Sequence, residues 1–156
     1  MKRIFVIQNT PLNEPLPLSV YLTGLMSNFS GKVGFEINLI IGGSKNNIPS
    51  KIKRLTKKIY QLETNTYSVQ DNIKFSKNVF SILKKQHKKK PIDVVHCLYP
   101  NSSLLGAVLF KKLINNKVRI IYDVRSPWIE MSISQGYINK RKVWLYRSIL
   151  FKEERL

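Results

Sequence analysis

The segment IDVVHCLYPNSSLLGAVLFKKLINNKVRIIYDV, residues 92–124, carries the pattern that decides the fold. Its apolar run at 92–97 is typical of a buried strand, and the polar turn after it leads into an apolar helix predicted at 104–116. A second apolar run at 118–124 indicates another strand. Two strands joined by a helix of this length form a crossover unit, so we expect them to run parallel.

The same alternation of strand and helix extends toward the amino terminus. Apolar runs predict buried strands at 3–8 and 35–43 and a minor strand at 59–63. This order of elements is typical of an α/β fold. We therefore expect a single Rossmann-like domain over residues 1–156, doubly wound, with a mainly parallel sheet and helices on both faces.

Further helices are predicted between and after these strands. An amphipathic helix at 71–90 ends before Pro91, and the basic segment 44–58 is predicted as loop with a short helix. The sequence ends inside a helix predicted at about 139–156, which indicates either a truncated or split protein or a natural terminal helix. The first helix follows Ser19, whose hydroxyl suits an N-cap. Its inward residues are predicted to be Val20, Leu22, Leu25, Met26 and Phe29.

The chain is strongly basic. It contains 27 Lys and Arg residues against 9 Asp and Glu residues, for a net charge of +18. Such a surplus favours a polyanionic partner, whether nucleic acid, an anionic membrane surface or a phosphorylated ligand. Compositional drift is the other explanation, because many lysines lie beside Asn and Ile. The basic runs at 51–58 and 84–90 lack interleaved aromatic residues, which makes nucleic acid the less favoured partner.

Cysteine content and hydropathy indicate where the protein resides. Cys97 is the only cysteine, so the sequence predicts no disulfide framework and favours the reducing cytoplasm. The basic segment 1–11 has only four consecutive apolar residues, too few for a signal peptide. No run approaches the roughly 18 apolar residues of a membrane span. We expect a cytoplasmic protein that is soluble or peripheral at the inner face of the membrane.

Polar segments follow four of the predicted strands. These segments are QNTPLNEPLP at 8–17, GGSKNN at 42–47, LYPNSS at 98–103 and DVRSPW at 123–128. In an open parallel sheet, ligands bind outside the carboxyl ends of the strands. The sequence therefore predicts that these four segments meet along one edge and form a binding crevice.

Five residues of the last two segments are the candidate binding residues. Arg125 offers a planar fork for a phosphate or carboxylate, and Asp123 would orient it. Asn101 and Ser102 begin a helix whose free backbone N–H groups favour an anion. Trp128 offers a flat surface for stacking on a sugar-like ligand.

Each candidate also has a purely structural explanation. Arg125 would pair with Asp123 or Glu130 in an ordinary ion pair. Trp128 would belong to the core, and Ser102 would serve only as a helix cap. The sequence alone leaves these alternatives open.

The two histidines and the cysteine give weaker signals. His96 ends a predicted strand and is either a packed, hydrogen-bonded core residue or a catalytic group, with the core residue favoured. His87 lies among lysines and is predicted to be solvated, whereas Cys97 is predicted to be a small buried apolar residue. No glycine-rich dinucleotide motif, P-loop or metal-ligand spacing occurs, so we expect no cofactor and no metal in this chain.

The order of the segments resembles a known family. KRIFVIQNTP at 2–11, FEINLIIGG at 35–43, the strand, turn and helix at 92–113, and VRIIYDVRSPWIE at 118–130 resemble the amino-terminal domain of GT-B-fold glycosyltransferases, family 4 in particular. Members show an Asp-apolar-apolar-His strand, a polar turn and a helix rich in Ala and Leu. A later strand ends in a motif similar to the segment from Asp123 to Trp128.

The resemblance implies half of a two-domain enzyme. In the family, the amino-terminal domain binds the sugar acceptor, and a carboxy-terminal domain binds a nucleotide-sugar donor. No second domain and no Glu-x7-Glu donor motif occur within 156 residues. The resemblance therefore implies an acceptor-binding domain that does not transfer sugar alone and is completed by a partner chain or a missing carboxy-terminal domain. Retaining members need no dedicated protein base.

The sequence departs from the family pattern at two places, and the resemblance also implies certain binding partners. The first loop is proline-rich where the family often has glycine, and Arg125 stands where a histidine is frequent. Related enzymes act on sugar or lipid-linked acceptors, which would give the basic clusters at 51–58, 84–90 and 140–147 an anionic membrane surface to bind. The alternative function is a non-catalytic α/β binding module whose basic face binds nucleic acid or an acidic partner.

Overall fold

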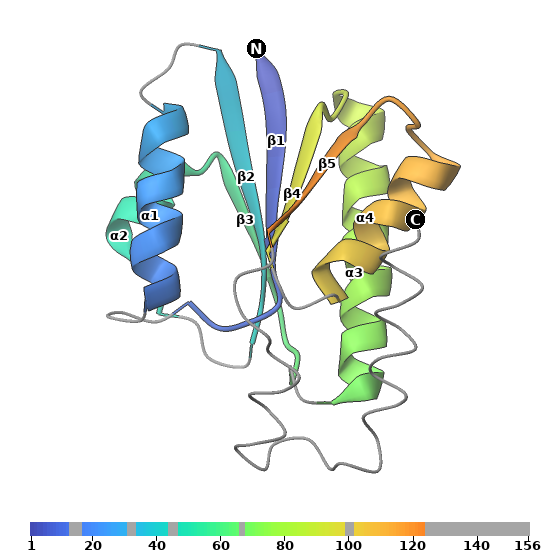
Figure 1. Cartoon of the computed structure of the whole chain (residues 1–156), viewed down its shortest axis with the longest axis horizontal. Helices are drawn as coiled ribbons and strands as arrows, with labels where there is room; N and C mark the ends of the chain where they lie inside the picture. The colour runs from blue at the N-terminus through green and yellow to red at the C-terminus, as the bar shows by residue number, and fades with distance from the viewer. Residues whose placement is uncertain (13–16, 31–33, 44–46, 66–67, 99–101, 124–156) are drawn as a thin grey trace.

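The computed structural model describes residues 1–123 with the exception of 13–16, 31–33, 44–46, 66–67 and 99–101. Strands and helices alternate along this part of the chain (Figure 1), and each corresponds to an element predicted from the sequence. In order, they are β1 (Lys2–Gln8), α1 (Pro17–Ser30), β2 (Phe35–Gly42), α2 (Ser50–Leu55), β3 (Lys58–Leu62), α3 (Val69–Lys89), β4 (Val94–Leu98), α4 (Ser102–Leu113) and β5 (Arg119–Asp123).

The strands form one parallel sheet in the order β3-β2-β1-β4-β5. Its register sets Ile4 of β1 beside Ile37 of β2 and Val94 of β4. The prediction of a Rossmann-like α/β fold is therefore confirmed. Strands β2 and β3 lie on one side of β1, and β4 and β5 lie on the other. The strand order therefore reverses between β1 and β4. Such a reversal is the place where sheets of this kind open a crevice at their carboxyl ends.

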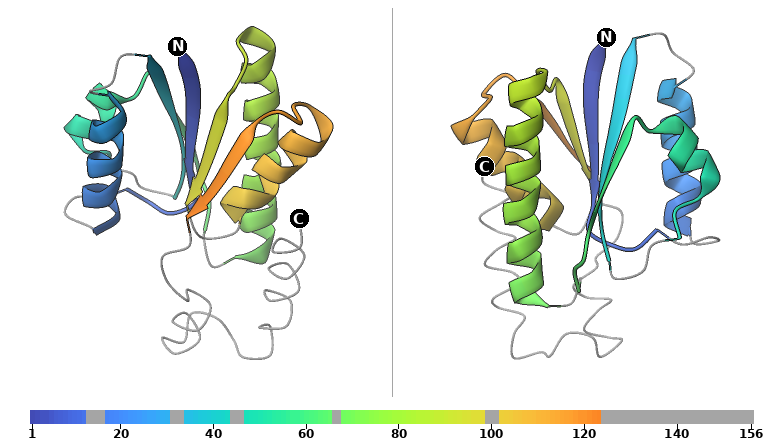
Figure 2. Two further views of the ribbon diagram at one scale, coloured as in Figure 1. Left: turned by 45° about the horizontal axis from the view of Figure 1, so that its top comes forward. Right: turned by 180° about the vertical axis from the view of Figure 1, so that it is seen from behind.

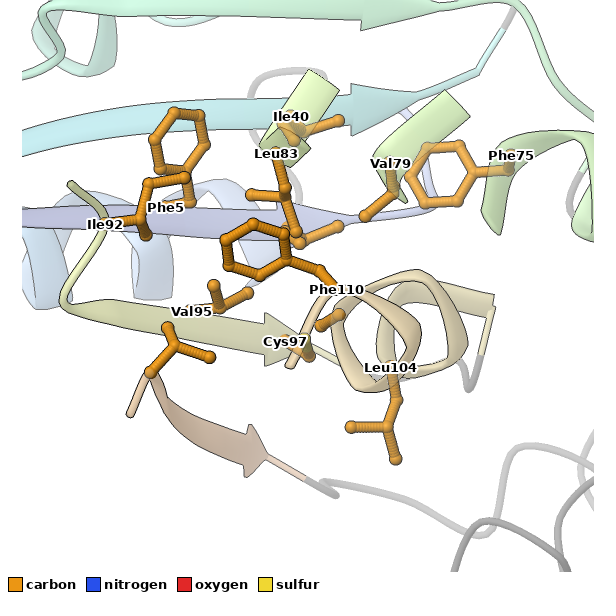
Figure 3. Packing of buried hydrophobic residues seen from close by; sticks show 13 residues of the cluster. Phe5, Ile40, Phe75, Val79, Leu83, Ile92, Val95, Cys97, Leu104 and Phe110 are labelled. Atoms are coloured by element: carbon orange, nitrogen blue, oxygen red, sulfur yellow. The ribbon is translucent and has the colours of Figure 1, made fainter. Parts of the chain in front are cut away.

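The helices cover both faces of the sheet, with α1 and α2 on one side and α3 and α4 on the other (Figure 2). Because β1 is central, its alternate residues enter both apolar cores. Phe5 and Ile7 join the core beneath α3 and α4, and Ile4 and Val6 join the core beneath α1 and α2. Figure 3 shows the larger core, in which Phe110 of α4 lies between the helices and the strands.

Close packing of α3 against α4 fixes where α4 begins. A methyl group at Gly106 would lie 2.5 Å from the backbone oxygen of Ser76, so only glycine allows this approach. The hydroxyl of Ser76 donates a 2.8 Å hydrogen bond to the carbonyl oxygen of Ser102. The first turn of α4, which the sequence places at the predicted crevice, is thereby anchored to α3.

At the opposite edge of the sheet, where the strands begin, a buried charge network joins three elements. Arg3 Nε donates to Glu36 Oε1 at 2.8 Å, and its guanidinium also donates to the carbonyl oxygens of Gln86 and Lys90. Lys90 Nζ lies 2.9 Å from Glu36 Oε2. Hydrogen bonds from Lys90, Asn38 and Arg3 lower the pKa of Glu36 to about 2, against the opposing effect of burial.

Three details of the sequence prediction are wrong, and one lies outside the described residues. Helix α1 begins at Pro17 rather than after Ser19, because proline suits a first helical position, where no N–H bond is needed. Val20 is 67% exposed instead of facing the core. His87 is half-buried rather than solvated, since its Nδ1 accepts a hydrogen bond from Ile92 N and its ring packs edge-on against a core phenylalanine. The helix predicted at 139–156 falls outside the described residues.

Candidate functional site

Polar side chains meet at the carboxyl edge of the sheet, as predicted, and Asn9 is their centre. Asn9 directly follows β1 and is fully buried. Its Nδ2 donates 2.7 Å hydrogen bonds to Asn72 Oδ1 of α3 and to Ser102 Oγ of α4. Its Oδ1 accepts a 2.8 Å hydrogen bond from Thr64 Oγ1, after β3. The side-chain amide of Asn9 thus joins the segments that follow β1, β3 and β4.

The two glycines after β2 make room for this centre. A methyl group at Gly42 would overlap Asn9 Oδ1 and lie 2.6 Å from Thr64 Oγ1. Gly43 has a φ of 114°, which L-residues with side chains rarely adopt, and its N–H donates to Thr64 Oγ1 at 3.1 Å. Gly42 and Gly43 therefore allow the close approach of the loops after β1, β2 and β3.

Ser102, a predicted binding residue, occupies the first position of α4 at this edge. It is 9% exposed, and its Oγ accepts the hydrogen bond from Asn9 Nδ2. The side chain therefore joins the Asn9 centre, which is a structural use. The next residue differs, because Ser103 Oγ is fully buried and makes no hydrogen bond to the described part of the chain.

Asp123, the second predicted residue that the structure describes, ends β5 at the same edge. Tyr21 of α1 donates a 2.9 Å hydrogen bond to Asp123 Oδ2. His96 Nε2 of β4 lies 3.8 Å from the same oxygen, beyond hydrogen-bond distance. The carboxylate is partly exposed, with 24% of its side-chain surface accessible, so it presents an acceptor to solvent at the rim.

His96 is buried, as the favoured interpretation of the sequence required, but it is not fully hydrogen-bonded. Its residue exposure is 7%, and Nε2 makes no hydrogen bond to any described residue. Burial lowers the pKa of His96, and the nearby Asp123 carboxylate raises it by a smaller amount. The imidazole is therefore held neutral beside a carboxylate at the point where the strand order reverses.

Of the five predicted binding residues, Asn101, Arg125 and Trp128 lie outside the described residues. Ser102 and Asp123 both lie at the carboxyl edge of the sheet. Ser102 contacts Asn9, and Asp123 contacts Tyr21. Sequence reasoning missed Asn9, Thr64, Asn72 and Tyr21. The available signal for Asn9 was its position directly after a buried strand, where polar side chains reach the rim.

The described residues at this edge supply hydrogen-bonding groups. Within the described part of the chain, no group of three or more His, Cys, Asp or Glu side chains is placed to hold a metal ion. The partly exposed carboxylate of Asp123 suits a ligand rich in hydroxyl groups.

No protein-family model matches the sequence, and a search of curated proteins gives no match. Among the described helices, none has both the length and the apolar composition that crossing a bilayer requires. Fold and site geometry are therefore the basis for a functional proposal.

Proposed function

We propose that this chain is the acceptor-binding domain of a GT-B-type glycosyltransferase. It would bind a sugar or a lipid-linked acceptor at the carboxyl edge of its sheet. A donor domain, on a partner chain or on a further part of the same protein, would bind the nucleotide sugar. On its own the chain would bind acceptor without transferring sugar to it.

The convergence of polar groups where the strand order reverses carries the proposal. The loops after β1, β2, β3 and β4 are joined through Asn9, Thr64 and Ser102, so the rim is a pre-formed surface. Pre-formed sites lose less conformational entropy when a ligand binds. The order of the sequence motifs, with Asp-Val-Val-His at 93–96 and Asp123 after the last described strand, adds the family resemblance to this geometry.

Asp123 has the most direct role in this proposal. A carboxylate accepts hydrogen bonds from sugar hydroxyls, and such charge-assisted bonds are about twice as strong as neutral ones. Tyr21 fixes the orientation of this partly exposed carboxylate by donating to Oδ2. The first N–H groups of α4 would contact the same ligand from the neighbouring segment.

Saturation-transfer NMR with the full chain tests the proposal. The panel contains glucose, galactose, mannose and N-acetylglucosamine, together with UDP-glucose and GDP-mannose. We expect at least one free sugar to bind weakly, and Asp123→Asn to weaken that binding about tenfold by removing a charge-assisted acceptor. Asp93→Asn is the matched control, because Asp93 is an exposed acid at the opposite edge.

Two results would contradict the proposal. Tight binding of the nucleotide sugars with no binding of free sugars would make this a donor domain. Absence of all sugar binding, together with binding of an oligonucleotide or an acidic peptide, would instead support the alternative of a non-catalytic binding module with a basic face. That alternative draws on the exposed cations at the amino edge of the sheet.

A further inference from the structure

Exposed cations gather at the amino edge of the sheet, opposite the candidate site. Helices α2, α3 and α4 each run back from the carboxyl edge, so their last turns lie where the strands begin (Figure 1). All three last turns are basic. We define the basic edge by the exposed residues Lys2, Lys53, Arg54, Lys88, Lys89, Lys111, Lys112, Lys117 and Arg119.

Acidic residues do not offset this charge. Of the carboxylates in the described residues, Glu63, Asp71 and Asp123 lie toward the carboxyl edge, at the ends of β3 and β5 and the start of α3. Glu36 lies at the amino edge but is already bound by Arg3 and Lys90. Asp93 is therefore the one acid at this edge that is in no salt bridge with a described residue. The domain is thus charge-asymmetric along the strand direction.

Stabilisation of helix ends does not explain the basic edge fully. Cations near a helix carboxyl terminus offset its dipole. In α3, however, Arg3 already donates to the carbonyl oxygens of Gln86 and Lys90. Lys88 and Lys89 are exposed and form no ion pair with another described residue. They add positive charge to a helix end that is already satisfied.

Exposed leucines lie within the basic edge. Leu113, at the end of α4, is 67% exposed, and Leu109 one turn earlier is 37% exposed. Residues four apart share one face of a helix, so the two leucines form an apolar stripe beside Lys112. Single-stranded nucleic acid calls for aromatic stacking surfaces among the cations. Leucine beside lysine suits the boundary between lipid headgroups and acyl chains.

We propose that the basic edge docks on an anionic lipid bilayer, with Leu109 and Leu113 entering the headgroup boundary. The inference goes beyond the proposed function and does not depend on it. Strand β1 has 7 residues, so the carboxyl edge stands about 23 Å from the bound surface. The rim faces away from the membrane in this orientation.

Vesicle flotation with the full chain tests this docking surface. The probes are vesicles of phosphatidylcholine alone and of phosphatidylcholine with about one third phosphatidylglycerol, at low and at physiological salt. We expect binding to the anionic vesicles only, weakened by salt. The variant Lys88→Gln, Lys89→Gln, Lys112→Gln should bind the anionic vesicles about a hundredfold more weakly, since each lysine near the surface contributes roughly a fivefold factor.

The matched control removes the same charge from elsewhere. Lys51→Gln, Lys74→Gln, Lys77→Gln changes three exposed lysines at the start of α2 and in the first half of α3. We expect its binding to fall only severalfold. A Leu113→Ser variant should bind severalfold more weakly, and this loss should persist at high salt because it is an apolar contribution.

Three outcomes would overturn the inference. An equal loss of vesicle binding in the two triple variants would mean that the net charge of the chain, and not the basic edge, attracts the bilayer. Equal binding to neutral vesicles would remove the role of charge. An oligonucleotide that competes the chain off anionic vesicles at physiological salt would show that nucleic acid is the preferred partner. None of these outcomes depends on sugar binding at the opposite edge.

Discussion

The two edges of the sheet differ in the kind of buried polar groups that they contain and in how these groups are hydrogen-bonded. At the amino edge, the buried cation Arg3 is paired with Glu36 and bound to carbonyl oxygens at the end of α3. At the carboxyl edge, neutral amides and hydroxyls around Asn9 join the loops, while His96 Nε2 and Ser103 Oγ remain without hydrogen bonds among the described residues. The donors of the Arg3 guanidinium are satisfied within the network at the amino edge, whereas the carboxyl edge retains open groups. Open buried polar groups are the ones that a ligand can satisfy.

The largest expected effect is at the amino edge. Arg3→Met removes the buried cation but keeps a side chain of similar length. Glu36 keeps Lys90 and Asn38 as partners, but it loses its guanidinium, and the carbonyl oxygens of Gln86 and Lys90 each lose a charged donor. We expect a loss of about 3–5 kcal/mol in the free energy of unfolding, measured by urea denaturation. Arg119→Met, at an exposed position at the start of β5, should change it by less than about 0.5 kcal/mol. Similar losses in both variants would show that the network contributes little.

The glycines of the carboxyl edge should give the next largest effect. Gly42→Ala places a methyl group against Asn9 and Thr64, and we expect overpacking to cost about 3 kcal/mol in the free energy of unfolding. Gly24→Ala is the matched control, because Gly24 lies in α1 with no atom within 4 Å of the added methyl. It should stabilise the protein by about 0.5 kcal/mol. A neutral Gly42→Ala would contradict the close approach of the loops.

Removal of the Asn9 side chain should have a moderate effect. Asn9→Ala leaves the polar groups of Thr64, Asn72 and Ser102 without a shared partner, at a cost of about 2 kcal/mol in the free energy of unfolding. Asn28→Ala, on the exposed side of α1, should be nearly neutral. Equal stability of the two variants would mean that the loops do not depend on Asn9.

The smallest expected effect is a pH dependence from His96. Because burial lowers its pKa, the unfolded chain takes up the proton more readily than the folded one. Stability should therefore fall as the pH drops below about 6.5, the ordinary value for histidine, and His96→Gln should remove this step. An NMR titration of the His96 imidazole measures this pKa directly, and a midpoint above about 6.5 would contradict the assignment.

The sequence was sufficient to predict the parallel sheet, but not the hydrogen bonds inside the candidate site. Apolar runs such as 92–97 are buried on both faces, so their pattern alone predicted parallel strands. Ser102 and Asp123 were placed at the correct edge because they follow such runs. The partners of Asn9 lie 55 to 93 residues away along the chain, and no local pattern identifies them. Glycine is required at position 42 because of close contact with Asn9 and Thr64, and this tertiary contact is likewise not visible in the local sequence.

Mapping sugar binding onto the backbone amides by two-dimensional NMR tests the central claim most directly. The claim is that the carboxyl edge is the open, ligand-binding edge of this domain. We predict that a bound sugar shifts the amide signals of residues 8–10, 102–104 and 121–123, and leaves those of 2–4 and 86–90 unchanged. Shifts confined to the amino edge, or spread evenly over both edges, would contradict the account.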